Sequence, residues 1–479
     1  MRIDKQPCPA RVNVMPFSPD FRRTFLLGLL AAGSLIALVG CANLAPDYTR
    51  PEAAVPHADP AASSDAAALD WRDFFSNERL RDTVALALAN NRDLRVAALN
   101  VDKARAAFQV TDAGRLPTVT ASADATKTQS SSSKNLQLAL SSFEIDLFGR
   151  VKNLSESAQQ SLFATAETRR STQISLVAEV ANSWLNLAAD LERQRLAQQT
   201  LESRQRTLVL TRRQYALGAI TGLELAQAQT AMESARVDAA AYPATVAQDR
   251  NALELLLGAA LPQALQPTAA DAQATVSALV DLPAGVPSSV LLQRPDVLAA
   301  EHSLIASHAD IGAARAALFP TISLTATAGR SSSALSDLFK GGNGVWSYGP
   351  SISLPIFDGG ASRASLRSAE VSRKIALATY DKTVQVAFGE VADALAVRAT
   401  LSERMAAQQA LNVSTTRQLQ LAQAKYQAGS STMLDVLDAQ RSLYSAQQSM
   451  ITLLLAEQSN RITLYKVLGG GWKNDKNES

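Results

Sequence analysis

The 479-residue chain contains few cysteines, few histidines and few aromatic residues. Its two cysteines are Cys8 and Cys41, and its three histidines are His57, His302 and His308. We expect Cys8 to lie in a segment that is removed, so the mature protein cannot form an internal disulfide. His302 and His308 are six residues apart and fall on different sides of a helix, which argues against a metal site. No Cys-x-x-Cys motif, phosphate-binding loop or nucleophile elbow is found, and we therefore predict no enzyme activity, no cofactor and no bound metal.

Neither sign of charge is in excess, and long apolar runs are missing beyond the N-terminus. Residues 1–40 hold five basic and two acidic residues, and the remainder holds 41 basic and 42 acidic residues. Such a balance gives no basic field, so we predict no nucleic-acid partner. After residue 40 no apolar run approaches the length of a transmembrane helix. If this chain crosses a membrane, it must therefore do so with β-strands.

The N-terminus has the pattern of a bacterial lipoprotein signal. A positively charged start precedes the apolar run from Phe25 to Val39, which is followed by "LVGC" from Leu38 to Cys41. In that pathway the segment before the cysteine is cleaved and the cysteine is lipidated. We therefore predict a signal peptide over residues 1–40 and a covalent lipid on Cys41 as the only attached group.

The sequence contains a tandem repeat. "RRQYALGAITGLELAQAQ" and "AQAKYQAGSSTMLDVLDAQ" share Tyr-x-x-Gly, an acidic residue and Ala-Gln, and their equivalent residues are 211 positions apart. Upstream, "NRDL" parallels "RPDV". Each half is predicted to run helix, two strands, helix, turn, helix. The expected boundaries are a tether and linker over 41–77, repeats over 78–258 and 290–470, a linker over 259–289, and a polar tail over 471–479.

Long helices dominate the prediction. No proline interrupts the chain from Val151 to Tyr215, which corresponds to a helix of roughly 100 Å. Within it, apolar residues and glutamines alternate three and four positions apart. This seam consists of Val177, Val180, Trp184, Leu187, Leu191, Gln194, Gln198, Leu201, Gln205 and Leu208. A hollow ring of helices tolerates glutamine in a seam, whereas a solid antiparallel bundle stays open as an alternative.

Two predicted β-hairpins separate the helices. Alternating apolar residues mark strands in "PTVTASADATKT", "KNLQLALSSFEIDLF", "PTISLTATAGR" and "VWSYGPSISLPIF". About ten residues per strand suffices to cross hydrocarbon at a tilt. Small sheets that cap a helical bundle in water remain the alternative. Because four strands cannot close a barrel, membrane insertion would require an oligomer.

The chain resembles a known family, the TolC-like outer membrane factors, and within it the NodT-type, OprM-like efflux lipoproteins. The resemblance covers nearly all of the sequence after Cys41. It is carried by "APDYTRP" (Ala45 to Pro51), the segment from Trp71 to Leu94, "DLFGR" (Asp146 to Arg150) and the segment from Leu282 to Gly329. The last of these contains Arg-Pro-Asp, Ala-Glu, Ile-Gly-x-Ala-Arg and Phe-Pro in the order that the family has.

The resemblance implies an α+β membrane protein. Long antiparallel helices would form a periplasmic α-barrel, and each of three chains would give four strands to a 12-stranded outer-membrane β-barrel. The linker over 259–289 would be equatorial, and the lipid on Cys41 would hold the chain to outer membrane lipid. The implied partners of this homotrimer are a periplasmic adaptor (a membrane fusion protein) and an inner-membrane transporter of the RND type. The implied function is a passive exit duct for small molecules and drugs.

The resemblance also places a gate at the two Tyr-x-x-Gly turns. It assigns Leu434, Asp438 and Asp435 to the pore constriction, Tyr426, Arg441 and Lys425 to contacts that hold it closed, and Tyr215, Gly218 and Gly429 to the tip turns. We expect Asp435 to add a second carboxylate to the constriction or to pair with Lys425. In the first repeat Ala226 and Gln227 replace Leu437 and Asp438, so the gate should depend mainly on the second repeat.

Two other functions stay open from the sequence. A duct for type I protein secretion would share the architecture, and a non-conducting helical lipoprotein would share the helices but place no strands in the membrane. A hydrolytic lipoprotein is disfavoured for want of site residues.

Overall fold

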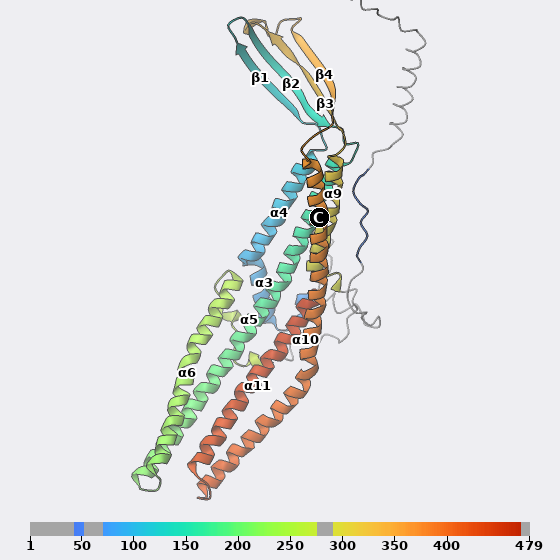
Figure 1. Cartoon of the computed structure of the whole chain (residues 1–479). Helices are drawn as coiled ribbons and strands as arrows, with labels where there is room; N and C mark the ends of the chain where they lie inside the picture. The colour runs from blue at the N-terminus through green and yellow to red at the C-terminus, as the bar shows by residue number, and fades with distance from the viewer. Residues whose placement is uncertain (1–42, 52–69, 275–290, 471–479) are drawn as a thin grey trace, which may run out of the picture. The chain divides into compact units, whose positions relative to one another are not determined.

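The computed structural model describes residues 43–51, 70–274 and 291–470 (Figure 1). The predicted signal segment, Cys41 and the predicted tail lie outside the described residues. In chain order the elements are α2 (Trp71–Phe74), α3 (Glu78–Asn90), α4 (Arg92–Ala113), β1 (Val119–Lys127), β2 (Ser132–Glu144), α5 (Arg150–Ala216), α6 (Gly222–Leu257), η2 (Gln263–Leu265), α7 (Asp271–Ala274), α9 (Pro295–Ala316), β3 (Thr321–Ser332), η4 (Leu335–Asp337), β4 (Gly344–Ser353), α10 (Ala361–Gln427) and α11 (Met433–Val467).

The predicted order of elements is confirmed in both repeats. The first repeat runs α4, β1, β2, α5 and α6, and the second runs α9, β3, β4, α10 and α11. The first repeat opens on two helices, α3 and α4, which meet at Asn91. Asn91 has an extended backbone, with φ −59° and ψ 132°, and its side chain accepts a hydrogen bond of 2.8 Å from Leu94 N. An asparagine with this geometry starts a new helix.

Helices α5 and α10 each contain 67 residues, so each is about 100 Å long. The predicted seam of α5 is buried only in part. Val177, Val180, Trp184 and Leu208 are buried as predicted, whereas Gln198 and Gln205 are exposed and the neighbouring Leu196 and Arg204 are buried instead. An α-helix repeats every 3.6 residues, so a pattern of period 3.5 drifts away from a fixed contact over this length. None of the helices in the described part of the chain combines the length and hydropathy that a membrane crossing requires.

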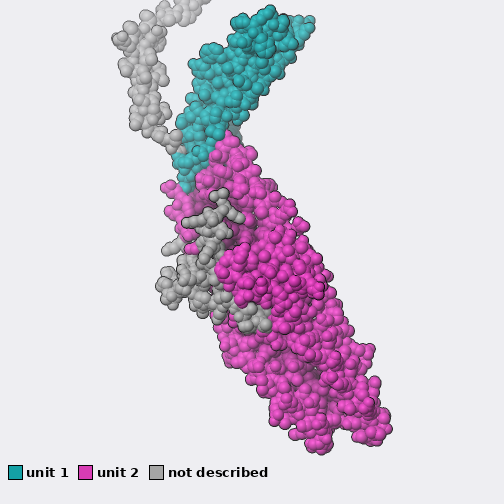
Figure 2. Space-filling view, turned by 180° about the vertical axis from the view of Figure 1, so that it is seen from behind, with its two compact units in different colours: residues 1–46, 114–154, 310–367 teal, residues 47–113, 155–309, 368–479 magenta. Residues whose placement is uncertain are grey.

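The chain divides into two compact units, coloured separately in Figure 2. Unit 1 consists of Met1–Pro46, Gly114–Leu154 and Asp310–Arg367, and unit 2 consists of Asp47–Ala113, Ser155–Ala309 and Ser368–Ser479. The units cut across the sequence repeats, because each repeat gives a hairpin to unit 1 and its long helices to unit 2.

Unit 1 contains one antiparallel sheet with the strand order β1-β2-β3-β4. Its register places apolar side chains on one face and polar side chains on the other, since successive residues of a strand alternate. The apolar face carries Val119, Ala121, Leu136, Leu138, Leu140, Ile322, Leu324, Ala326, Ala328, Trp346, Tyr348 and Ile352. The polar face carries Thr120, Ser122, Asp124, Asn135, Gln137, Thr325, Thr327, Ser347 and Ser351. Thr327 and Ser347 hydroxyls are 2.7 Å apart across two strands. The predicted alternation is therefore confirmed.

Unit 2 has its main core where the short helices meet the long ones. The core cluster includes Trp184 of α5, Leu253 of α6, Ile462 and Tyr465 of α11, and Phe74 of α2. Phe74 stacks on Tyr465 with ring centroids 4.3 Å apart. Trp184 Nε1 donates a hydrogen bond of 3.0 Å to Leu265 O, which satisfies the one polar atom of a fully buried ring.

Equivalent side chains cap equivalent helix ends in the two repeats. Asn91 Nδ2 donates a hydrogen bond of 2.8 Å to Leu256 O, in the last turn of α6. Arg294 Nη1 donates a hydrogen bond of 3.0 Å to Val467 O, in the last turn of α11. Helix C-termini leave carbonyls without intrahelical partners, and these bonds satisfy one at each end. The "NRDL" and "RPDV" motifs thus have the same structural role in both repeats.

Candidate gate at the helical tips

Two helical hairpins, α5–α6 and α10–α11, turn at the same end of unit 2 (Figure 1). The turning glycines, Gly218 and Gly429, have φ angles of 69° and 72°, a conformation that strains other residues. Ala219 N donates to Gln214 O, and Ser430 N donates to Lys425 O, each over 2.9 Å. Together with bonds from the glycine amides, these form the same helix-ending motif in both repeats.

Each following helix begins with a reciprocal pair of hydrogen bonds. Thr221 and Glu224 form the pair at the start of α6, and Thr432 and Asp435 form it at the start of α11. Asp435 Oδ2 accepts bonds of 2.9 Å from both Thr432 N and Thr432 Oγ1. These bonds lower the pKa of Asp435 below its usual value, and the charge of Lys425 contributes less in the same direction. Asp435 therefore caps α11, because its carboxylate accepts hydrogen bonds from Thr432. Its place at the constriction, or in a pair with Lys425, stays a prediction.

The first turns of α11 have a packed face and an exposed face. Met433, Val436 and Leu437 form a buried cluster against Tyr426 of α10 and Ala231 of α6. Leu434, Asp438 and Arg441 are spaced four and three residues apart and therefore share one face of the helix. This is the exposed face. Leu434 is 45% exposed, and Arg441 Nη2 is 3.0 Å from Asp438 Oδ1. Arg441 thus pairs within its own helix in a single chain.

Tyr426 connects the two hairpins. Its hydroxyl donates a hydrogen bond of 2.7 Å to Gln214 Oε1 at the end of α5. The equivalent tyrosine of the first repeat, Tyr215, is 48% exposed. The sequence predicted a closing contact for Tyr426 but did not identify Gln214, because nothing in the local pattern marks one glutamine among many on α5.

A second connection between helices was also missed by the sequence analysis. Arg204 of α5 is buried, and its Nη1 donates a hydrogen bond of 2.7 Å to Ala231 O of α6. Its guanidinium lies 5.9 Å from the ring centroid of Tyr444 on α11. Burial lowers the pKa of Arg204, yet an arginine stays charged at any physiological pH. One buried charge therefore joins three helices behind the tips.

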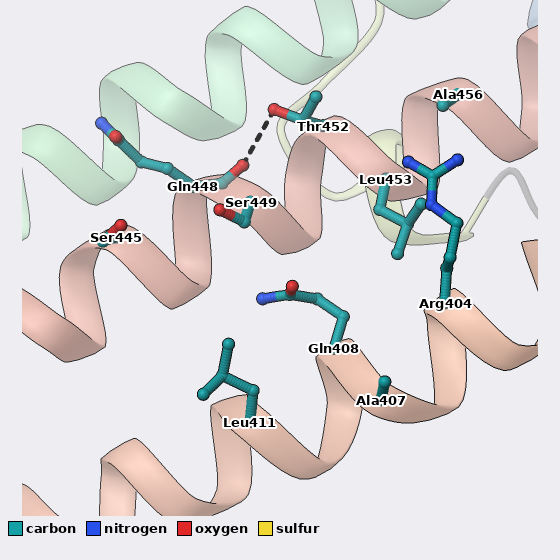
Figure 3. Close-up of a pocket in the computed structure, with 10 residues that line it drawn as sticks. All are labelled: Arg404, Ala407, Gln408, Leu411, Ser445, Gln448, Ser449, Thr452, Leu453 and Ala456. Carbon is teal, nitrogen blue, oxygen red and sulfur yellow. Dashed lines mark hydrogen bonds between the residues drawn. The ribbon is translucent and has the colours of Figure 1, made fainter.

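Above the tips, α10 and α11 enclose a polar groove of about 620 Å³ (Figure 3). Its lining comprises Arg404, Ala407, Gln408, Leu411, Ser445, Gln448, Ser449, Thr452, Leu453 and Ala456. Gln408 Nε2 donates a hydrogen bond of 2.9 Å to Ala446 O across the groove. This lining has no carboxylate, histidine or cysteine and so offers no pair for acid–base catalysis. A second groove of about 1120 Å³, nearer the tip, includes Lys425, Asp435 and Asp438.

Comparison with known proteins assigns this architecture to a class. A sequence model described as "Outer membrane efflux protein" matches residues 83–259 and 286–470. The toluene efflux pump outer membrane protein TtgC of Pseudomonas putida is 42% identical over 466 residues, which cover 93% of this chain and 96% of that protein. The probable outer membrane lipoprotein SilC of Salmonella typhimurium is 39% identical over 462 residues, covering 94% and 99%.

A solved structure gives the same result. The open state of the Neisseria gonorrhoeae MtrE outer membrane channel superposes with a TM-score of 0.82 at 37% identity, covering 91% of this chain and 99% of that one. The fold, with its two-faced sheet and paired long helices, is that of an outer-membrane channel. The chain belongs to the outer membrane efflux protein family. It is an efflux channel of the outer membrane, as the resemblance implied, and its family is one of channels rather than enzymes.

Proposed function

We propose that three copies of this chain form one duct, in which twelve strands close into a membrane-spanning cylinder. The observation that carries this proposal is the two-faced sheet. Its apolar face suits lipid, its polar face suits a water-filled lumen, and strands β1 and β4 stand at its edges. Unpaired strand edges are not stable in hydrocarbon, and pairing β1 of one copy with β4 of the next removes both.

The duct is the outer-membrane part of a tripartite pump, with a periplasmic adaptor and an inner-membrane transporter of the RND type as its partners. TtgC, a relative over nearly the whole length, is named as part of an efflux pump. The α5–α6 turn also presents Leu217, which is 84% exposed, and Leu223, which is 68% exposed. Exposed apolar side chains at a helical tip favour a protein partner there. The cargo is small molecules and drugs.

Three copies of the α11 tip form the gate. Three Leu434 side chains give an apolar constriction and three Asp438 carboxylates a charged one, and such rings both close and select. The exposed position of Leu434 and Asp438 on the same face of α11 supports this assignment. Tyr426 and Arg441 hold the tip closed, and Gly218, Gly429 and Tyr215 shape the turns. The solved MtrE structure is described as an open state, which supports a duct that opens and closes.

A lipid on Cys41 anchors the chain to the outer membrane. The name of SilC includes the word lipoprotein, and this relative covers nearly the whole chain. After the cysteine, the chain consists of the segment 41–77, the first repeat, the linker over 259–289 and the second repeat.

Substitution of neighbouring residues on opposite faces of β2 tests the proposed membrane insertion. Leu138→Lys places a charge on the apolar face and should cost about 2–4 kcal/mol of insertion free energy near the bilayer centre. The matched variant Gln137→Lys places the same charge on the polar face and should insert normally. The measurement is the fraction of trimer recovered from the outer membrane and its native mass. Equal recovery of the two variants would contradict the proposal and favour the non-conducting helical lipoprotein.

A further inference from the structure

Gly312 lies inside α9, close to the C-terminal end at Ala316, and a glycine inside a helix costs about 1 kcal/mol relative to alanine. It belongs to the Ile-Gly-x-Ala-Arg motif, to which the channel function gives no role. A Cβ at this position would lie 2.5 Å from Asn153 Nδ2, 2.7 Å from Ala45 Cβ and 2.8 Å from Ala45 Cα. The glycine is therefore required by the close approach of Asn153 and of the segment Asn43–Pro46. This segment is part of the predicted tether and linker over 41–77, and from here on the tether means Asn43–Pro46 alone.

Polar contacts hold the tether on both sides of this glycine. Asn153 Nδ2, at the start of α5, donates a hydrogen bond of 2.9 Å to Asn43 Oδ1. Ala45 N donates to the same oxygen over 3.2 Å. Arg315 Nη1, one turn after Gly312, donates a hydrogen bond of 3.3 Å to Leu44 O. The Asn153 residue is only 2% exposed, so its amide is committed to this contact.

A second motif glycine faces the same segment. Gly149 of "DLFGR" has a φ of 74°, and a Cβ there would lie 3.4 Å from Asn43 Oδ1 and 3.2 Å from Asn153 Nδ2. Two motifs that are far apart in the sequence thus meet at the tether within unit 1. Both leave room for its backbone or side chain.

The chain that follows the tether is held separately, within unit 2. Tyr48 donates a hydrogen bond of 2.9 Å to Glu301 Oε1, and Arg50 forms an ion pair with Glu301 Oε2. The Tyr48 ring packs against Val297, Leu304 and Tyr380. The Ala-Glu motif therefore also has a role in holding this N-terminal segment, because its Glu301 binds Tyr48 and Arg50.

We propose that Gly312, Arg315 and Asn153 form an intramolecular binding site for the tether, and that its occupation fixes where the lipid on Cys41 leaves the protein. The inference rests on the lipidation in the proposed function. Two residues of chain, from Asn43 back to Cys41, reach at most about 7 Å. A docked tether therefore holds the lipid close to the first turn of α5. An undocked tether would let the lipid move further from the protein.

Disulfide trapping in the full-length lipidated protein tests this site. After signal removal the lipidated Cys41 is the sole remaining cysteine of the chain, so the pair Asn43→Cys and Asn153→Cys would crosslink only with each other. Side chains in contact at these positions should crosslink rapidly in outer-membrane vesicles. Gly312→Ala, which places a methyl group against Ala45, should slow the crosslink at least tenfold, and Arg315→Ala should slow it less.

Gly389→Ala is the matched control. Gly389 lies within α10, and a Cβ there would meet no atom within 4 Å, so its crosslinking rate should equal that of the parent. An unchanged rate in Gly312→Ala would overturn the proposal. Conductance of the same preparations reports on the duct independently, so a conducting protein with a free tether would refute this inference alone.

Discussion

The Tyr426 hydroxyl donates a hydrogen bond of 2.7 Å to Gln214 Oε1 and so joins the tips of the two helical hairpins. Tyr426 and Gln214 have repeat equivalents, Tyr215 and Lys425, each 211 positions away. Within one chain Tyr215 is half exposed. In a ring of alternating hairpins, each contact between neighbouring copies would be the repeat equivalent of the Tyr426–Gln214 contact. It would place Tyr215 of one copy next to Lys425 of the adjacent copy.

Tyr426→Phe should make the resting duct more permeable. The substitution removes one hydrogen bond, worth about 1 kcal/mol, from each chain. Single-channel recording should show more frequent or longer openings, and Gln214→Ala should have the same effect because it removes the acceptor. Tyr348→Phe, on the apolar face of the sheet, is the control and should leave the recording unchanged. Identical opening in Tyr426→Phe and the parent would argue against a closing role for this bond.

Tyr215 and Lys425 should lie together between copies. With Tyr215→Cys and Lys425→Cys in one chain, oxidation should give disulfide-linked dimers and trimers on a denaturing gel. Tyr426→Cys with Gln214→Cys should instead give a crosslink within single chains. If the first pair yields only monomers in a protein that remains trimeric, the alternating arrangement of hairpins is wrong.

The sequence predicted the elements well because each one depends on local pattern. The helix predicted from Val151 to Tyr215 matches α5 within one residue at each end, and alternation located the four strands. It predicted less well where a contact depends on distant chain segments. The Tyr426–Gln214 bond joins residues 212 positions apart, and its geometry depends on how two long helices pack. The drift of the α5 seam likewise follows from helix geometry over many turns.

Some features of the candidate gate had usable local signals. The spacing of Thr432 and Asp435 is that of a helix capping pair, which the structure contains, and this spacing could have identified the structural task of Asp435. An isolated glycine within a helical pattern has a packing reason in many cases, and Gly312 is such a residue. Arg204 had no signal, since its burial follows only from the packing of three helices.

Removal of Arg294 should destabilise the helical unit more than removal of Asn91. Arg294 bonds Val467 O and also pairs with Asp296 and Glu390 over 2.7 and 2.8 Å. Arg294→Ala should lower the free energy of unfolding by about 2–4 kcal/mol, and Asn91→Ala by about 1–2 kcal/mol. Thermal unfolding followed by intrinsic fluorescence should rank the two variants in this order, with the exposed Arg92→Ala near the parent. The reverse ranking would contradict the added stabilisation that the two ion pairs of Arg294 are expected to give.

The free energy of unfolding should fall as the pH rises from about 4 to about 7, because Asp249 loses its proton over this range. Burial raises the pKa of Asp249 to about 7, and the neighbouring Asp190 adds to the rise. In the unfolded chain this carboxyl titrates near 4, so between these values the folded chain binds the proton more strongly. Its contribution is complete below that range and is lost as the pH passes 7. Asp249→Asn should flatten the dependence of Tm on pH in this window. A variant with the slope of the parent would show that another group is responsible.

Planar-bilayer conductance of the purified protein tests the placement of the gate most directly. Leu434→Ala widens the proposed apolar ring, and Asp438→Ala removes the charged ring together with its ion pair to Arg441. Leu223 is the repeat equivalent of Leu434, 211 positions away, and Leu223→Ala is therefore the matched control. We predict a small conductance for the parent and for Leu223→Ala, and a larger one for Leu434→Ala and Asp438→Ala. Conductance that is the same in all four proteins would contradict a gate at the α11 tip.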